Sequence, residues 1–250
     1  MSSVRHRLGP LPSNGISEGA LLQEVSDLAG PALERVRARG RFDREVESSV
    51  EAIAHAIDAR DSYTSRHSDE VVELATIVGG RLGLDRETLG ELQTGARLHD
   101  VGKIAIPDSI LQKQASLDTA EWEVMKQHPV VGSDLLERVS GLERVARIVR
   151  SEHERWDGTG YPDGLRADQI PLASRIIFVC DAYHAMTSDR PYREALRPST
   201  AVSELRRYAG LQFDPNVVET LILELRSRSV STRVPGGRPV AGLVDGERAG

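Results

Sequence analysis

The chain has 250 residues and a formal net charge of −6, and its composition is 39% hydrophobic and 28% charged. This composition is typical of a globular domain, whereas the negative charge argues against a nucleic-acid polymer or an anionic membrane surface as the main partner. No apolar run approaches the roughly 18 residues of a membrane span, and the first residues lack the core of a signal peptide. The single cysteine, Cys180, excludes an intrachain disulfide and is typical of a reducing compartment. We therefore expect a cytoplasmic protein without membrane insertion.

Three regions differ in composition. Residues 1–42 carry an apolar helical stripe from Leu21 to Ala29 that breaks at Gly30 and Pro31. We expect this region to be a helical overhang, either packed on the main domain or used as a dimer or signalling helix. The main domain is expected over residues 43–229, and the Ser, Arg, Pro and Gly content of residues 230–250 predicts a disordered tail.

The main domain is predicted to be all-α, since no period-two alternation competes with the helical spacing of its apolar residues. Helices are predicted to begin near His67, after Asp85 and after Asp118, which forms a capping box with Glu121. Pro129 predicts that the third of these helices ends near His128. Further helices are expected over residues 142–149, 173–186, 199–209 and 215–226.

His99 and Asp100 stand side by side near the middle of the chain. They offer a metal an imidazole nitrogen and a carboxylate oxygen that can bridge two ions. Adjacent helical residues point about 100° apart, so both contact one cluster only where a helix ends beside it. The apolar spacing before His99 and the glycine at position 102 predict such an end. Alone the pair is a weak indication, because a single histidine on a helix is more often a core or surface residue.

Seven stretches in one order resemble the HD-GYP branch of the HD superfamily of metal-dependent phosphohydrolases, whose members are usually cyclic di-GMP phosphodiesterases. The stretches are residues 59–64, 98–110, 121–129, 153–165 with Gly160-Tyr161-Pro162, 170–171, 190–193 and 213–215. Seven ordered matches are far more specific than a His-Asp pair. The resemblance implies an HD-domain-like helical bundle with a C-terminal HD-GYP helical extension.

The resemblance also implies a site for two divalent metal ions. The implied ligands are His67, His99, Asp100, His128, Glu152, His153 and Asp181. Mixed imidazole and carboxylate ligation favours iron or manganese over magnesium or calcium, and the lone cysteine excludes a zinc–thiolate cage. The expected reaction is hydrolysis of a phosphodiester by a hydroxide that bridges the metals, with Asp100 as the bridging ligand and Lys103 as the second catalytic residue.

Four residues are expected to bind the substrate, namely Lys103, Tyr161, Arg190 and Arg193. A guanidinium can fork onto a phosphate or onto guanine. The expected substrate is cyclic di-GMP or a related cyclic dinucleotide, with pGpG or GMP as the product. Expected partners are an upstream sensory or receiver module, a diguanylate cyclase, or a second copy through the N-terminal helix. Each substrate-binding role has an alternative. Lys103 could be a solvated lysine, Arg190 and Arg193 a surface pair, and Tyr161 a residue that only shapes its loop.

Some positions depart from the family pattern. Glu152 precedes His153 where the family has two histidines, His184 stands where it has a second aspartate, and residues 112–116 replace a Lys-Pro-Gly turn. Tyr63 stands where some members have a glutamate for a third metal, so we expect two metals. Glu152 and His184 exchange residue types, and we hypothesise that they pair across the site. The alternative function is a non-hydrolytic cyclic-dinucleotide sensor or interaction module.

Overall fold

The computed structural model describes residues 66–189 and 194–231, together with residues 52, 54, 56 and 60. The N-terminal region 1–42, Arg190, Arg193 and the tail from residue 232 lie outside the described residues. The chain divides into two units, residues 1–49 and 50–250, and every described residue belongs to the second. The predicted domain boundaries therefore stay predictions.

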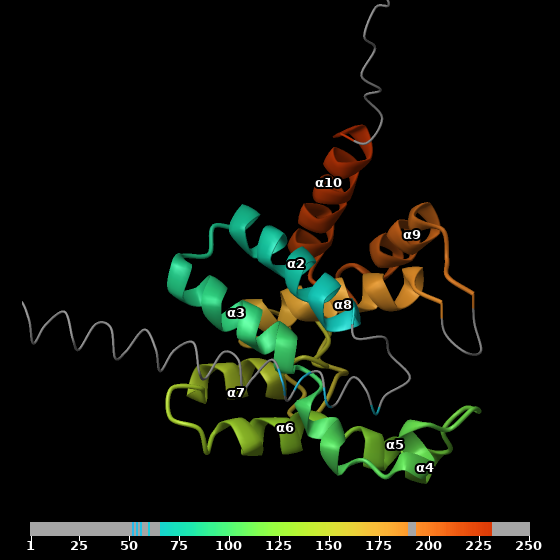
Figure 1. The fold of residues 1–250 in the computed structure, drawn as a ribbon. Helices are drawn as coiled ribbons and strands as arrows, with labels where there is room; N and C mark the ends of the chain where they lie inside the picture. The colour runs from blue at the N-terminus through green and yellow to red at the C-terminus, as the bar shows by residue number, and fades with distance from the viewer. Residues whose placement is uncertain are drawn as a thin grey trace, which may run out of the picture. The chain divides into compact units, whose positions relative to one another are not determined.

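The described residues form helices joined by turns and loops (Figure 1). In chain order they are α2 (Arg66–Arg81), α3 (Arg86–Leu98), the 3-10 helix η1 (Val101–Ala105), α4 (Asp108–Leu111), α5 (Thr119–Met125), α6 (His128–Leu136), α7 (Glu143–Arg150), the 3-10 helix η2 (Ala167–Gln169), α8 (Leu172–Thr187), α9 (Pro198–Tyr208) and α10 (Pro215–Ser231). In the described ranges there is no strand, only an isolated bridge between Ala209 and Phe213. The predicted all-α fold is confirmed. None of the helices in these ranges is both long and apolar enough to span a membrane.

Two helix starts form as their sequences predict. The Asp85 side chain accepts a hydrogen bond from the Thr88 amide at 2.8 Å and caps α3. At α5, Asp118 accepts from the Glu121 amide at 2.9 Å, while the Glu121 carboxylate accepts from the Asp118 amide at 2.8 Å. These bonds satisfy amide groups that have no partner inside the helix, which is why short polar side chains fix where a helix begins.

The prediction that a helix ends at His128 is wrong. Helix α5 already ends at Met125, and His128 begins α6 with Pro129 in its first turn. Proline is tolerated there, because the amide it lacks would have no intrahelical partner. At the other end of the domain, α10 extends to Ser231, five residues beyond the predicted Arg226. The predicted tail therefore begins inside this helix.

The larger hydrophobic core surrounds α8. This helix packs against α2, α3, α9 and α10, and Figure 1 shows it lying between these elements. Ile176, Ile177, Val179 and Cys180 are all buried, so α8 is enclosed on more than one face. Enclosure fixes the rotation of the helix about its axis. It therefore also fixes the direction of the polar residues that α8 carries.

A second core cluster joins the end of α3 and η1 to α6 and α7, through Leu98, Val101, Leu136 and Val149 among others. Within it, the backbone of η1 lies directly on α6. A Cβ atom added at Gly102 would lie 1.8 Å from the carbonyl oxygen of His128 and 2.6 Å from the amide nitrogen of Gly132. Only glycine allows this approach, which brings residues 99–103 against the start of α6.

We expect Gly102→Ala to lower the free energy of unfolding by about 3 kcal/mol, because the new methyl group meets backbone that cannot move aside. The matched control is Gly90→Ala in α3, where an added Cβ meets nothing within 4 Å. That variant should be up to about 1 kcal/mol more stable, since alanine is the better helix former. Urea unfolding followed by circular dichroism measures both. Equal stabilities would show that η1 does not depend on this contact.

Candidate metal centre

One group of potential metal ligands consists of His67, His99 and Asp100, and is called the first donor group below. Its ligand atoms all lie within 4.8 Å of one another. His67 lies in the first turn of α2, whereas His99 follows the last residue of α3 and Asp100 precedes η1. Helix α3 ends beside the donor group as expected, so the consecutive residues His99 and Asp100 both face it.

The second donor group consists of His128, Glu152 and His153, whose ligand atoms also lie within 4.8 Å of one another. His128 comes from the first turn of α6, and the other two come from the turn after α7. The Nε2 atom of His128 lies 3.0 Å from Glu152 Oε1 and 3.1 Å from His153 Nε2.

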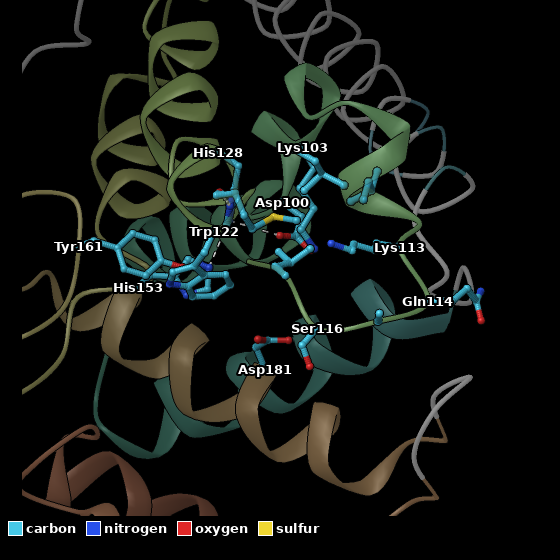
Figure 2. A pocket seen from close by; sticks show the side chains of 15 residues that line it. Asp100, Lys103, Lys113, Gln114, Ser116, Trp122, His128, His153, Tyr161 and Asp181 are labelled. Carbon is cyan, nitrogen blue, oxygen red and sulfur yellow. Dashed lines mark hydrogen bonds and ion pairs between the residues drawn. The ribbon is translucent and has the colours of Figure 1, made fainter. Parts of the chain in front are cut away.

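Asp100 belongs to the first donor group and also approaches the second. Its Oδ2 atom is 3.4 Å from His99 Nε2, and its Oδ1 atom is 3.7 Å from His128 Nε2. From α8, Asp181 approaches the first group, with Oδ1 at 3.3 Å from His67 Nε2. All seven sequence-predicted ligands thus converge, and Figure 2 shows Asp181 projecting from α8 toward the side of the cavity where Asp100 lies.

The backbone sets the tautomers of two histidines. His99 Nδ1 lies 2.7 Å from the carbonyl oxygen of Ala96, and His128 Nδ1 lies 2.8 Å from that of Met125. A carbonyl oxygen only accepts hydrogen bonds, so each Nδ1 carries the proton and donates it. In a neutral imidazole this leaves Nε2 as a bare lone pair directed at the cluster, which is the form that binds a metal.

Glu152 tests whether these groups fit a metal ion. Its side chain is 1% exposed, and within the described structure its Oε2 atom has no hydrogen-bond partner. Burial raises the pKa of Glu152 well above its usual range, and burial with the neighbouring His128 lowers the pKa of His153 to about 3. An unsatisfied buried oxygen beside bare imidazole nitrogens is costly unless a cation lies among them. The donor set therefore fits divalent metal ions with mixed nitrogen and oxygen ligands.

The other two carboxylates are held in their charged form. Burial alone raises the pKa of Asp100, but Lys103, His99 and His128 hold it well below its usual range. Lys103 Nζ donates to Asp100 Oδ2 at 2.8 Å. Burial likewise raises the pKa of Asp181, and a hydrogen bond with His67 lowers it below its usual range. Both carboxylates thus have the charge that a metal ligand needs.

A cavity of about 750 Å³ opens beside the donor groups. This volume is typical of sites for small-molecule ligands. Asp100, Lys103 and Asp181 line it together with the aromatic rings of Trp122 and Tyr161. In Figure 2, Tyr161, Trp122 and His153 lie on one side of Asp100, and Lys113, which forms an ion pair with Glu121, lies on the other.

The Gly-Tyr-Pro segment lies against the second donor group. The Tyr161 ring stacks on His153 with 5.0 Å between ring centroids and 24° between ring planes. A Cβ added at Gly160 would lie 2.3 Å from the Arg155 amide nitrogen, so this loop also depends on close backbone packing. The buried Glu154 carboxylate accepts from the Asp163 amide at 2.7 Å and holds the loop from beneath.

The hypothesis that Glu152 and His184 form a pair is not borne out. Glu152 contacts His128 and His153, whereas His184 Nδ1 lies 2.7 Å from His67 Nδ1, beside the other donor group. No hydrogen bond or ion pair joins the two exchanged residues in the described part of the chain. The reason is that α8 faces α2, while the turn after α7 faces α6.

Sequence reasoning missed Glu70, whose Oε2 atom lies 2.9 Å from His184 Nε2. It also missed that Lys113 and Trp122 line the cavity. Glu70 had a detectable signal, because it lies one helical turn after His67. The two cavity residues had none, since they reach the site only through tertiary packing. Arg190 and Arg193 are outside the described residues.

A sequence model of the HD-domain family matches residues 51–217. Among named relatives, the cyclic di-GMP phosphodiesterase response regulator RpfG of Xanthomonas campestris is 40% identical over 196 residues, which cover 78% of this chain and 51% of the relative. A cyclic di-GMP phosphodiesterase of Thermotoga maritima is 39% identical over 165 residues, 65% of this chain and 45% of the relative. A 3′3′-cGAMP-specific phosphodiesterase of Vibrio cholerae is 36% identical, over 68% of this chain and 33% of the relative. The chain thus spans about half or less of the length of these relatives.

Two solved structures share the fold. A cyclic GMP-AMP-specific phosphodiesterase of Vibrio cholerae superposes with a TM-score of 0.57 and 20% identity, over 73% of this chain and 50% of the other. An HD-GYP protein of Bdellovibrio bacteriovorus superposes with a TM-score of 0.52 and 22% identity, over 64% and 51%. At these identities the likeness supports the fold alone.

We expect Glu152→Gln to lower the affinity for divalent metal by at least about tenfold and to change the stability of the metal-free protein little, since the buried carboxylate lacks a full set of partners. The matched control is Glu224→Gln in α10, a buried carboxylate outside both donor groups that pairs with Arg81 and Arg228. It should lower stability by about 1 kcal/mol without changing metal affinity. Chelator competition and urea unfolding measure the two quantities. If Glu152→Gln, like the control, lowered stability and left metal affinity unchanged, Glu152 would be excluded as a ligand.

Proposed function

The chain belongs to the HD-domain family, in its HD-GYP branch, and we propose that it is a metal-dependent phosphodiesterase that hydrolyses a cyclic dinucleotide. The observation that carries the proposal is the position of Asp100. Its two oxygens face a histidine of each donor group, and its charged form is stabilised by Lys103. A carboxylate so placed suits a bridge between two cations at the wall of a cavity of ligand size.

The two donor groups would hold one divalent ion each, with Asp100 shared and Asp181 added to the first group. Manganese and iron are the metals we propose, because imidazole nitrogen with carboxylate oxygen suits both. When bound, the ions would neutralise the charge of a phosphodiester and lower the pKa of a coordinated water. The full set of proposed ligands is His67, His99, Asp100, His128, Glu152, His153 and Asp181.

The chain's own groups have separate tasks in the proposed reaction. Water adds to phosphorus, the bond from phosphorus to one ribose oxygen breaks, and that oxygen takes up a proton. The Lys103 ammonium faces the cavity beside Asp100 and is placed to attract a phosphate oxygen. The Tyr161 ring packs on His153 and would fix this imidazole while it lines the cavity.

Cyclic di-GMP is the substrate we propose, because two of the similar relatives carry its name. A relative that is specific for 3′3′-cGAMP makes this the next candidate. Arg190 and Arg193 would contact phosphate or guanine, as the family resemblance implies. The products are pGpG, GMP or both.

The chain matches only part of its relatives, and one of these is named a response regulator. We propose that residues 43–229 are the phosphodiesterase domain and that residues 1–42 connect it to a sensory or receiver module, a diguanylate cyclase or a second copy.

Hydrolysis by purified protein tests the proposal directly. The protein is prepared without oxygen, loaded with Mn²⁺ or Fe²⁺, and incubated with cyclic di-GMP, 3′3′-cGAMP or cyclic di-AMP, and the products are separated by chromatography. We expect Asp100→Ala to lose more than about 100-fold of the activity and much of the bound metal, since Asp100 is the one carboxylate among the described residues whose two oxygens face a histidine of each donor group. The control Asp69→Ala removes an exposed carboxylate of α2 and should change neither.

The outcomes separate the two functions. Metal-dependent hydrolysis that Asp100→Ala abolishes supports the enzyme. Tight binding of a cyclic dinucleotide with no hydrolysis under any metal supports the sensor instead. Two metals per chain in Asp100→Ala would remove Asp100 from the bridging role.

We expect Arg190→Ala to weaken binding of cyclic di-GMP by about tenfold or more and to leave metal affinity unchanged, because the guanidinium is proposed to contact the nucleotide alone. Arg197→Ala, an exposed arginine just before α9, is the nearby control and should change neither. Titration calorimetry with the nucleotide measures the effect. If the unchanged protein and both variants bound the nucleotide equally well, Arg190 would be a surface residue without a role in substrate binding.

A further inference from the structure

His184 forms a chain of close contacts that ends at a proposed metal ligand. Its Nδ1 atom lies 2.7 Å from His67 Nδ1, and its Nε2 atom lies 2.9 Å from Glu70 Oε2. The Ser188 hydroxyl is farther from His184, at 3.2 Å from Nε2 and 3.4 Å from Nδ1. His67 and His184 are both buried, whereas the Glu70 side chain is 53% exposed. The chain of contacts therefore runs from the surface to the first donor group.

Each contact fixes the position of one proton. A carboxylate only accepts hydrogen bonds, so Nε2 of His184 must donate to Glu70. A neutral imidazole has a single N–H, which leaves Nδ1 of His184 as an acceptor. The short contact between the two Nδ1 atoms then requires that His67 Nδ1 carries the proton. Nε2 of His67, which lies 3.3 Å from Asp181 Oδ1, is then the nitrogen on which a metal can replace a proton.

We propose that Glu70 and His184 are positioning residues that set the tautomer and orientation of His67 for metal binding. This inference rests on the proposed function, because it takes His67 as a metal ligand. His99 and His128 obtain the same tautomer from backbone carbonyl groups, whereas His67 obtains it from these two side chains. The family resemblance places an aspartate at position 184, which would accept directly from His67. In this chain a histidine occupies that position, and the carboxylate comes from α2 instead.

The geometry explains why both residues are needed. His184 alone can donate from either nitrogen, and if it donated from Nδ1, His67 Nδ1 would become the acceptor and its proton would move to Nε2. A metal could then bind His67 only after that proton had left. Glu70 removes this choice, because it holds the His184 proton on Nε2. The pair thus stabilises the one tautomer of His67 that is ready to bind a cation.

The first test reads the tautomers in the metal-free protein by ¹⁵N NMR of histidine side chains. We expect protonated Nδ1 at His67 and protonated Nε2 at His184. Glu70→Ala should yield a mixture of tautomers at both residues, while circular dichroism and the urea midpoint stay close to those of the unchanged protein. A His67 ring without a proton on Nδ1 in the unchanged protein, or tautomers that Glu70→Ala leaves unaltered, would overturn the inference.

The second test measures metal affinity in two backgrounds by chelator competition with Mn²⁺. In the natural chain, Glu70→Ala should weaken binding by about tenfold. The control Glu73→Ala removes a carboxylate of the same helix that pairs with Arg228, and should leave the affinity unchanged. In the His184→Asp background the aspartate accepts from His67 directly, so Glu70→Ala should no longer weaken binding.

These measurements separate the inference from the proposed function. If the natural chain binds Mn²⁺ and Glu70→Ala binds it equally well, the inference fails while the metal site remains. An equal loss in both backgrounds also overturns it, since Glu70 would then act without His184. If the natural chain binds no divalent metal, the proposed function fails and takes the inference with it.

Discussion

The structure depends on one constraint, which is that several potential ligand atoms are buried close together with too few hydrogen-bond partners. His128 Nε2 lies about 3 Å from both Glu152 Oε1 and His153 Nε2, and Glu152 Oε2 has no partner among the described residues. Such an arrangement destabilises a protein without a cation. The packing of α8 among its neighbours and the direct contact of Gly102 with α6 hold it in place. The site thus destabilises the folded protein, and burial of apolar side chains in the two hydrophobic cores offsets this.

Carbonyl groups at the ends of two helices set the tautomers of two ligand histidines. The last carbonyl groups of a helix have no partner inside it, and two of them accept protons from ligand histidines. Ala96 lies near the end of α3 and accepts from His99, and Met125 ends α5 and accepts from His128. Both histidines stand three residues after their acceptor, so one local pattern occurs twice. His67, in the first turn of α2, has the side chain of His184 beside its Nδ1.

The sequence predicts most helices, because capping residues and apolar spacing are local signals, whereas the seven ligands that converge were implied by the resemblance to the HD-GYP family. The caps at Asp85 and Asp118 formed as expected. The prediction from Pro129 that a helix ends at His128 was wrong. Proline can stop one helix or begin another, and the local sequence does not say which. Helical spacing could have placed Glu70 near His67, but it could not predict the contact of Glu70 with His184. Glu70 lies 114 residues away in the chain, and only the packing of α2 on α8 brings the two together.

The exchange at position 152 changes the charge of the site. Asp100, Asp181 and Glu152 provide three carboxylates against the four positive charges of two divalent ions, so the proposed loaded site would carry a single positive charge with a coordinated water and none once that water has ionised. With a histidine at position 152 that charge would be one unit higher. Lys103 at the cavity wall adds a cation of its own, and Lys113 lies nearby although Glu121 partly neutralises it. The acid at position 152 therefore shifts part of the attraction for an anionic substrate from the metals to these lysines, which makes binding more sensitive to salt.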